Sequence, residues 1–109
     1  MEVKTLNLDG VWVVEVSGEI NLSTSGDLKK SFEKLPMKKI VVDLERVSYI
    51  DSSGLATLVE MLKKTKSQGG SLGLATMSEK VKSLFEITKL DKLFQIYPGQ
   101  KEALSASKK

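Results

Sequence analysis

The first twenty positions alternate between apolar and polar residues, with one interruption. Residues 3–8 show the period of two that is typical of an edge strand, and residues 11–16 form a more strongly apolar run. Between them, Asp9 and Gly10 are a strong signal for a two-residue hairpin, because both positions tolerate a positive φ angle. We therefore predict two antiparallel strands, the second of which ends before residues 18–21 break the pattern.

From residue 23 onward, helix-like apolar spacing alternates with short, continuous apolar runs. The runs at residues 39–44, 71–75 and 94–97 predict strands, and residues 45–50 are expected to form a loop. The intervening segments predict helices, because apolar residues recur three or four positions apart between caps and helix breakers. These helices follow the capping candidates Ser23, Thr24 and Ser25 as far as Pro36, run from residues 51–54 to about Gln68, follow Ser78, and occupy residues 100–105.

The resulting element order is β-β-α-β-α-β-α-β-α. Strand–helix–strand units of this length need right-handed crossovers, which place their strands parallel in one sheet. We therefore predict an α/β fold with a mixed sheet of about five strands and about four helices. The N-terminal hairpin is antiparallel and the remainder of the sheet is parallel. The length of 109 residues fits a single domain over residues 1–109.

Composition removes several function classes. The chain has no cysteine and no histidine, which excludes a disulfide framework, a Cys/His zinc site, a Ser-His-Asp triad and a cysteine nucleophile. Arg46 is the only arginine, and the lysines are spread along the chain, so a direct nucleic-acid partner is not expected. The N-terminus lacks the pattern of a signal peptide, and no apolar run approaches membrane-spanning length. We expect a cytoplasmic protein with no membrane partner.

The segment Asp51-Ser52-Ser53-Gly54 is the one stretch that suggests specific chemistry. It lies where a loop turns into a helix, and the free N–H groups of a helix N-terminus favour an anion. A phosphate on Ser52 would be tolerated there, yet it would add about −1.5 to −2 charges to the rim of the sheet. That combination suits a switch at an interface. Asp and Ser are also ordinary helix caps, so the residues alone leave both interpretations open.

Residues 41–44 and 49–55 together resemble the signature of STAS domains, and more closely that of bacterial anti-sigma factor antagonists. The segment Ser17-Gly18-Glu19-Ile20 is similar to a segment that this family carries after its second strand. Gly69-Gly70 and the apolar positions Val81, Leu84, Phe85, Leu90 and Phe94 also fit, so the resemblance covers nearly the whole chain.

The resemblance implies a regulator that is not an enzyme and needs no cofactor. In this family the unphosphorylated protein binds an anti-sigma factor that is also a serine kinase, and the sigma factor is released. Phosphorylation of the first serine of the segment, here Ser52, ends the complex, and a serine phosphatase restores it. Many members carry Asp at the position of Asn21, which leaves the kinase contact open. The partner-binding residues implied are Gly18, Glu19, Asn21, Ser23, Asp51, Ser53, Gly54 and Leu55.

Three other interpretations have to be weighed. The first is a STAS-domain subunit of a larger stress-signalling assembly, or a ligand-sensing STAS module. The second is a receiver domain phosphorylated on aspartate, but this needs an acidic Mg²⁺ pocket, and Asp43 is expected to face solvent at a strand end. The third is an enzyme, for which Ser52 has no histidine base. Weak nucleotide binding near Ser52 stays open, although the chain has no Walker-type phosphate loop.

Overall fold

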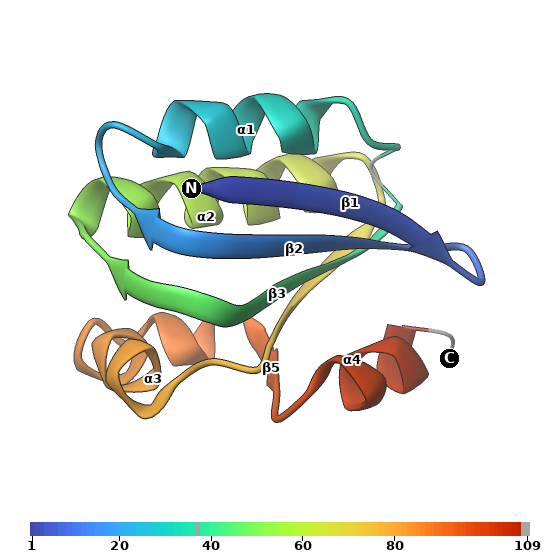
Figure 1. The fold of residues 1–109 in the computed structure, drawn as a ribbon. Coiled ribbons are helices and arrows are strands. Elements are labelled where there is room, and N and C mark those ends of the chain that lie inside the picture. The colour runs from blue at the N-terminus through green and yellow to red at the C-terminus, as the bar shows by residue number, and fades with distance from the viewer. Residues whose placement is uncertain (37, 108–109) are drawn as a thin grey trace.

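Strands and helices alternate along the computed structural model, which describes residues 1–36 and 38–107 (Figure 1). The order agrees with the predicted one, apart from one additional turn of 3-10 helix. The elements are β1 (Glu2–Leu8), β2 (Val11–Ile20), α1 (Ser25–Glu33), β3 (Lys39–Ile50), α2 (Ser52–Ser67), β4 (Ser71–Ala75), α3 (Glu79–Ile87), η1 (Leu90–Lys92), β5 (Gln95–Tyr97) and α4 (Gln100–Ser107).

The strands form a five-stranded sheet in the order β1-β2-β3-β4-β5. β1 is antiparallel to β2, and the other neighbouring pairs are parallel. The hairpin between β1 and β2 turns at Asp9 and Gly10, whose φ angles are 54° and 87°, as the sequence indicated. The predicted mixed sheet is therefore confirmed.

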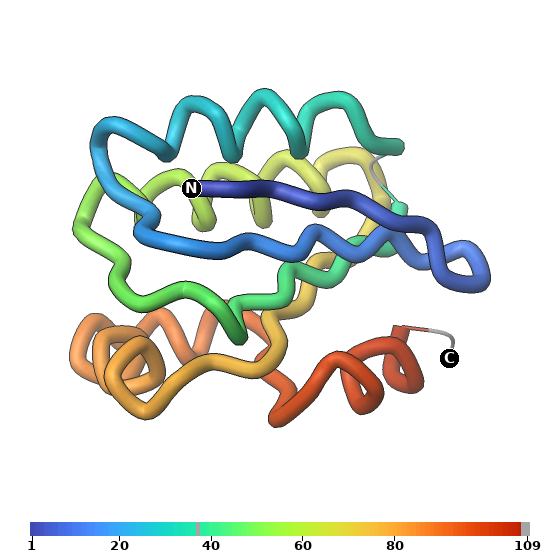
Figure 2. Tube along the Cα trace, viewed as in Figure 1, coloured from blue at the N-terminus to red at the C-terminus, as the bar shows by residue number. Residues whose placement is uncertain are grey.

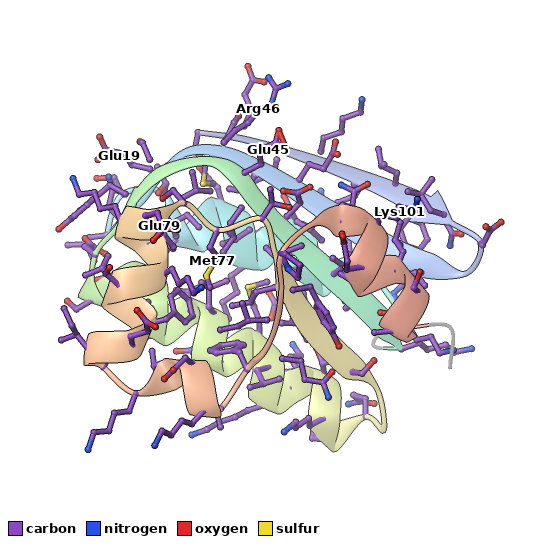
Figure 3. All side chains as sticks on the ribbon, turned by 90° about the horizontal axis from the view of Figure 1, so that it is seen from below. Glu19, Glu45, Arg46, Met77, Glu79 and Lys101 are labelled. Atoms are coloured by element: carbon purple, nitrogen blue, oxygen red, sulfur yellow. The ribbon has the colours of Figure 1, made fainter. Side chains whose placement is uncertain are left out.

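Buried side chains form two clusters, one on each face of the sheet. Successive side chains of β3 point to opposite faces: Ile40 and Val42 belong to the larger cluster, and Val41 belongs to the smaller one. Helices α1, α2 and α3 contribute to the larger cluster, whereas Ala103 of α4 belongs to the smaller. Figure 3, seen from below, shows α2 and α4 on opposite sides of β3. The sheet is thus covered by helices on both faces, but unequally.

Two predictions about strand length are wrong. β2 continues beyond residue 16 to Ile20, and residues 45–50 belong to β3 instead of forming a loop. The parallel pairing of the two strands persists as far as Ile20 opposite Ile50, with irregularities in the register of β2. Gly18, with a φ of 100°, lies at one of them, where a residue with a side chain would be strained. The long pair brings the ends of β2 and β3 to one edge.

The expectation that Asp43 faces solvent at a strand end is also wrong. Asp43 lies within β3 and is 7% exposed. Its carboxylate accepts hydrogen bonds from the N–H of Glu45, at 2.9 Å, and from Nε2 of Gln100 in α4, at 2.6 Å. The same Gln100 nitrogen donates to Glu15 on β2, at 3.1 Å. A residue 57 positions later in the chain therefore covers Asp43 and supplies the donor that a buried carboxylate requires.

Candidate functional site

The carboxyl ends of β2 and β3 lie together at one edge of the sheet. Figure 2 shows the two turns that follow them side by side, at the end of the molecule opposite the β1–β2 hairpin. The N–H of Asp51 donates to the C=O of Ile20, at 3.1 Å, which joins the two turns at their base. Neighbouring parallel strands present such turns at one edge, where ligand and partner sites gather in α/β folds.

Asp51 begins helix α2 and uses both of its carboxylate oxygens. It is the N-cap residue with an extended backbone, and Oδ1 accepts from the N–H of Gly54 at 2.9 Å. Oδ2 accepts from the N–H of Leu22, in the turn after β2, at 3.2 Å. The residue that caps α2 therefore also links the two turns through a hydrogen bond.

Gly54 is required by the close packing of the same two segments. A Cβ atom added there would lie 2.5 Å from the carbonyl oxygen of Ile20 and 2.8 Å from side-chain methyl carbons of Ile20 and Ile50. No ordinary side chain fits within such distances. The glycine of the Asp-Ser-Ser-Gly segment thus allows the first turn of α2 to lie directly against the end of β2.

The two serines of the segment differ in exposure. Ser52, the first residue of α2, is exposed, whereas Ser53 is half-buried. Among the described residues, neither hydroxyl has a hydrogen-bond partner, and the N–H groups of both serines are also free. The first turn of α2 contains no acidic residue. The free N–H groups of the two serines therefore lie next to an accessible hydroxyl, and the Asp51 cap is the carboxylate at this helix start.

The turn after β2, residues 21–24, is organised by its own side chains. Oδ1 of Asn21 accepts from the N–H groups of Ser23 and Thr24, at 2.9 and 3.2 Å. The Thr24 hydroxyl donates to the C=O of Glu19, at 2.8 Å, and accepts from the N–H of Asn21, at 2.9 Å. Thr24 is the N-cap of α1, but its side chain does not cap that helix. The capping candidate of the sequence instead fixes the shape of the turn.

The other predicted partner-binding residues lie at this edge with different exposure. Glu19 and Ser23 are exposed, Gly18 is half-buried in β2, and Gly54 and Leu55 are buried. Buried residues can shape such a surface but offer it little side-chain area. The role of each of these residues at an interface stays a prediction.

Leu22 is a residue that the sequence analysis missed. It lies between Asn21 and Ser23 in the hydrogen-bonded turn, and it is 78% exposed, as is Ile87 at the end of α3. The signal that could have found it is an isolated leucine among polar turn residues. Together with Ser52, it gives the edge one apolar and one hydroxyl feature.

Comparison with known families assigns the fold to a known group. The STAS domain family model matches residues 2–103. The chain belongs to the STAS domain family. Among the curated STAS relatives, the anti-sigma-B factor antagonist of Staphylococcus aureus (strain NCTC 8325 / PS 47) is 33% identical over 104 residues, covering 91% of this chain and 94% of the relative. The anti-sigma-B factor antagonist of Staphylococcus epidermidis is 31% identical with the same coverage.

Solved structures agree with this family. An anti-sigma factor antagonist from Mycobacterium paratuberculosis has a TM-score of 0.88 at 30% identity and covers 99% of this chain and 94% of its own. The anti-sigma factor antagonist SpoIIAA in its unphosphorylated form has a TM-score of 0.71 at 14% identity, covers 96% of each chain, and so shows the shared fold. This STAS domain is therefore similar in sequence and structure to anti-sigma factor antagonists.

Two other features are absent from the described part of this STAS domain. Residues 1–36 and 38–107 contain no group of three or more acidic, histidine or cysteine side chains arranged to hold a metal ion. No helix among them combines the length and the apolar character needed to cross a bilayer.

Proposed function

We propose that this STAS domain binds an anti-sigma factor that is also a serine kinase, and that phosphorylation of Ser52 ends the complex. A serine phosphatase would restore the binding form. In this function residues 1–109 act as one domain in the cytoplasm, without a cofactor and without a catalytic step of their own. The relatives described above carry the antagonist function, and the finer steps are inferred from the edge formed by β2, β3 and α2.

The single observation that supports the switch most directly is the environment of Ser52. Its hydroxyl is exposed and unbonded within the described residues, so a kinase can reach it without breaking local structure. The free N–H groups at the start of α2, and the absence of an acidic residue from its first turn, favour a phosphate at this place. The half-buried Ser53 is less accessible.

The same phosphate would be unfavourable in a complex. It adds about −1.5 to −2 charges beside the exposed Leu22, on the edge that a partner would cover. A charge that loses water at an interface without gaining an opposite charge costs several times more than a helix dipole returns. Phosphorylation is therefore compatible with the free domain and incompatible with docking.

The decisive experiment is phosphorylation followed by binding. The protein is incubated with its cognate anti-sigma factor and ATP, and the phosphate is mapped by tandem mass spectrometry, with Ser52 as the expected site. Calorimetry then compares the wild type with Ser52→Ala, which we expect to bind persistently, and Ser52→Asp, which we expect not to bind. Ser71→Asp adds the same charge at an exposed serine where β4 begins, and should bind normally. Phosphate found only on Ser53, or full binding by folded Ser52→Asp, contradicts the proposal.

Asn21 gives a second test of the same edge. Its Oδ1 holds the turn, and its Nδ2 lies 3.4 Å from Oε1 of Glu19. In Asn21→Asp, one oxygen can keep the two turn bonds, but the other faces the Glu19 carboxylate. We expect altered kinase affinity with little change in thermal unfolding. Unchanged affinity would show that this turn lies outside the interface.

A further inference from the structure

We propose that Asp51 is a positioning residue that holds the apolar side chain of Leu22 beside Ser52, as a preformed anchor for the anti-sigma factor. This inference rests on the proposed function and deepens it. It assigns separate tasks to the two oxygens of one carboxylate, and it names the chemistry that the partner must offer. That chemistry is an apolar pocket next to the kinase site that receives the Ser52 hydroxyl.

Capping of α2 uses only one of the two carboxylate oxygens of Asp51. Oδ1 accepts from the N–H of Gly54, which satisfies the cap, as Oγ of Ser78 does for α3 with a single acceptor. The second oxygen accepts from the N–H of Leu22, 29 positions earlier in the chain. A serine, which suffices as a cap at α3, is too short to reach both N–H groups. Asparagine has one acceptor oxygen instead of two.

The backbone around Leu22 is held on both sides. Before it, the C=O of Ile20 accepts from the N–H of Asp51 at 3.1 Å, and after it, the N–H of Ser23 donates to Oδ1 of Asn21 at 2.9 Å. The peptide between these two ties is held at both ends: the C=O of Asn21 accepts from the N–H groups of Thr24 and Ser25, and the N–H of Leu22 donates to Asp51. The leucine side chain therefore projects from an ordered backbone, although the side chain itself is 78% exposed.

Such an arrangement lowers the cost of binding. A side chain on a fixed backbone loses less conformational freedom when a partner covers it, so more of its apolar burial appears as affinity. Placing the anchor and the phospho-acceptor on one carboxylate-linked unit also fixes their spacing. The partner then meets Leu22 and Ser52 as one feature of fixed geometry.

The first experiment tests positioning in the free protein, whatever its function. Amide hydrogen exchange is measured by NMR for the wild type and for Asp51→Asn, whose single acceptor oxygen keeps the cap. We expect the Leu22 amide to exchange at least about tenfold faster in the variant, while the Gly54 amide is unchanged. Glu102→Gln, which removes one negative charge from the first turn of α4, is the matched control and should change neither amide. Unchanged exchange at Leu22 in Asp51→Asn overturns the inference.

The second experiment tests the anchor with the anti-sigma factor, through a double-mutant cycle. Leu22→Ala and Asp51→Asn should each weaken binding about tenfold, and the double variant should be little weaker than either single one. A purely structural role of Asp51 would give effects that multiply, and that result overturns the inference. Failure of the wild type to bind any anti-sigma factor overturns the proposed function instead, and the exchange experiment still decides what Asp51 does.

Discussion

Helices α2 and α3 have the same kind of N-terminal cap, but the residues around the two caps differ. Asp51 and Ser78 are both N-caps with extended backbones, and each accepts from the N–H three residues later, at 2.9 and 3.2 Å. α3 carries Glu79 in its first turn, labelled in Figure 3, whereas α2 has no acidic residue there. The carboxylate at the start of α2 is thus the cap Asp51 itself, whereas at α3 it is Glu79 within the first turn, and the N–H groups of Ser52 and Ser53 stay free for an anion.

The third residue of each helix extends this contrast. It is Gly54 in α2, pressed against the end of β2, and Val81 in α3, a fully buried core residue. The start of α3 is therefore held by apolar packing, while the start of α2 is held by backbone contact with a neighbouring strand. The exposed start of α2 can be held in place only by contacts on its buried side. Gly54 allows those contacts because it has no side chain. Variants at the two helix starts probe that difference.

Gly54→Ala should have the largest effect on stability. The new methyl group meets a backbone carbonyl oxygen at 2.5 Å, and overpacking of this kind costs about 1–3 kcal/mol, more than the gain in helix propensity. Gly26→Ala in α1 is the matched control, because nothing lies within 4 Å of its added Cβ, and it should stabilise by roughly 0.5–1 kcal/mol. Chemical denaturation measures both. Equal effects at the two glycines would show that the close approach to β2 has no energetic weight.

Ser78→Ala should have the second-largest effect on stability. It removes the cap from α3 and should lower the free energy of unfolding by about 1 kcal/mol, without changing affinity for the anti-sigma factor. Ser83→Ala, at an exposed position within the same helix, should cost nothing. If loss of the α3 cap weakened partner binding as strongly as changes at Asp51 do, the start of α2 would have no special role in binding.

Charge at the first turn gives the next smaller effect. Ser52→Asp adds a carboxylate to the first turn of α2, beside that of the Asp51 cap, and should stabilise the free domain by at most about 0.3–1 kcal/mol at low ionic strength. Glu79→Gln should destabilise α3 by a similar amount. Added salt should shrink both differences. Thermal unfolding at two salt concentrations checks this, and a destabilising Ser52→Asp would show that the start of α2 does not favour an anion.

The smallest effect is expected at an ion pair remote from both N-termini, between Glu33 of α1 and Lys64 of α2, at 2.9 Å. The hydrogen bond and charge of Lys64 lower the pKa of Glu33 below its ordinary value of 4.5. The contribution of the pair is therefore present above that ordinary value and is lost as the pH falls through the lowered pKa. The stability difference between wild type and Lys64→Met should be small at neutral pH and vanish in acid. A difference that grows in acid would contradict the assigned sign.

The fold was largely predictable because the local sequence patterns indicate the same strands and helices that the structure contains. β-branched runs, the Asp9-Gly10 hairpin and helical spacing each mark their element without help from distant residues. The extensions of β2 and β3 were not predictable, because they depend on backbone pairing between two segments that are far apart in the sequence. Burial of Asp43 was equally hidden, since it depends on Gln100 from the other end of the chain.

The candidate site was predictable to the level of its segment and no further. The sequence marks Asp51 as a cap and Ser52 as an accessible serine, because both properties are local. The second bond of Asp51 and the fixed, exposed Leu22 depend on how two turns meet at the edge of the sheet. Periodicity carries no information about which backbone N–H a spare carboxylate oxygen will reach.

The lack of cysteine, which excluded several chemistries above, makes this domain convenient to label. A single introduced thiol would be the only one in the chain, so a maleimide dye would attach at one place. Thr5 on the edge strand β1 is exposed and pairs with Val14 of β2. The six residues from Val14 to the end of β2 at Ile20 span about 20 Å, which separates Thr5 from the edge that carries Ser52. Fluorescence anisotropy of a Thr5→Cys conjugate would follow binding and release of the proposed partner in real time, with the dye well away from Ser52.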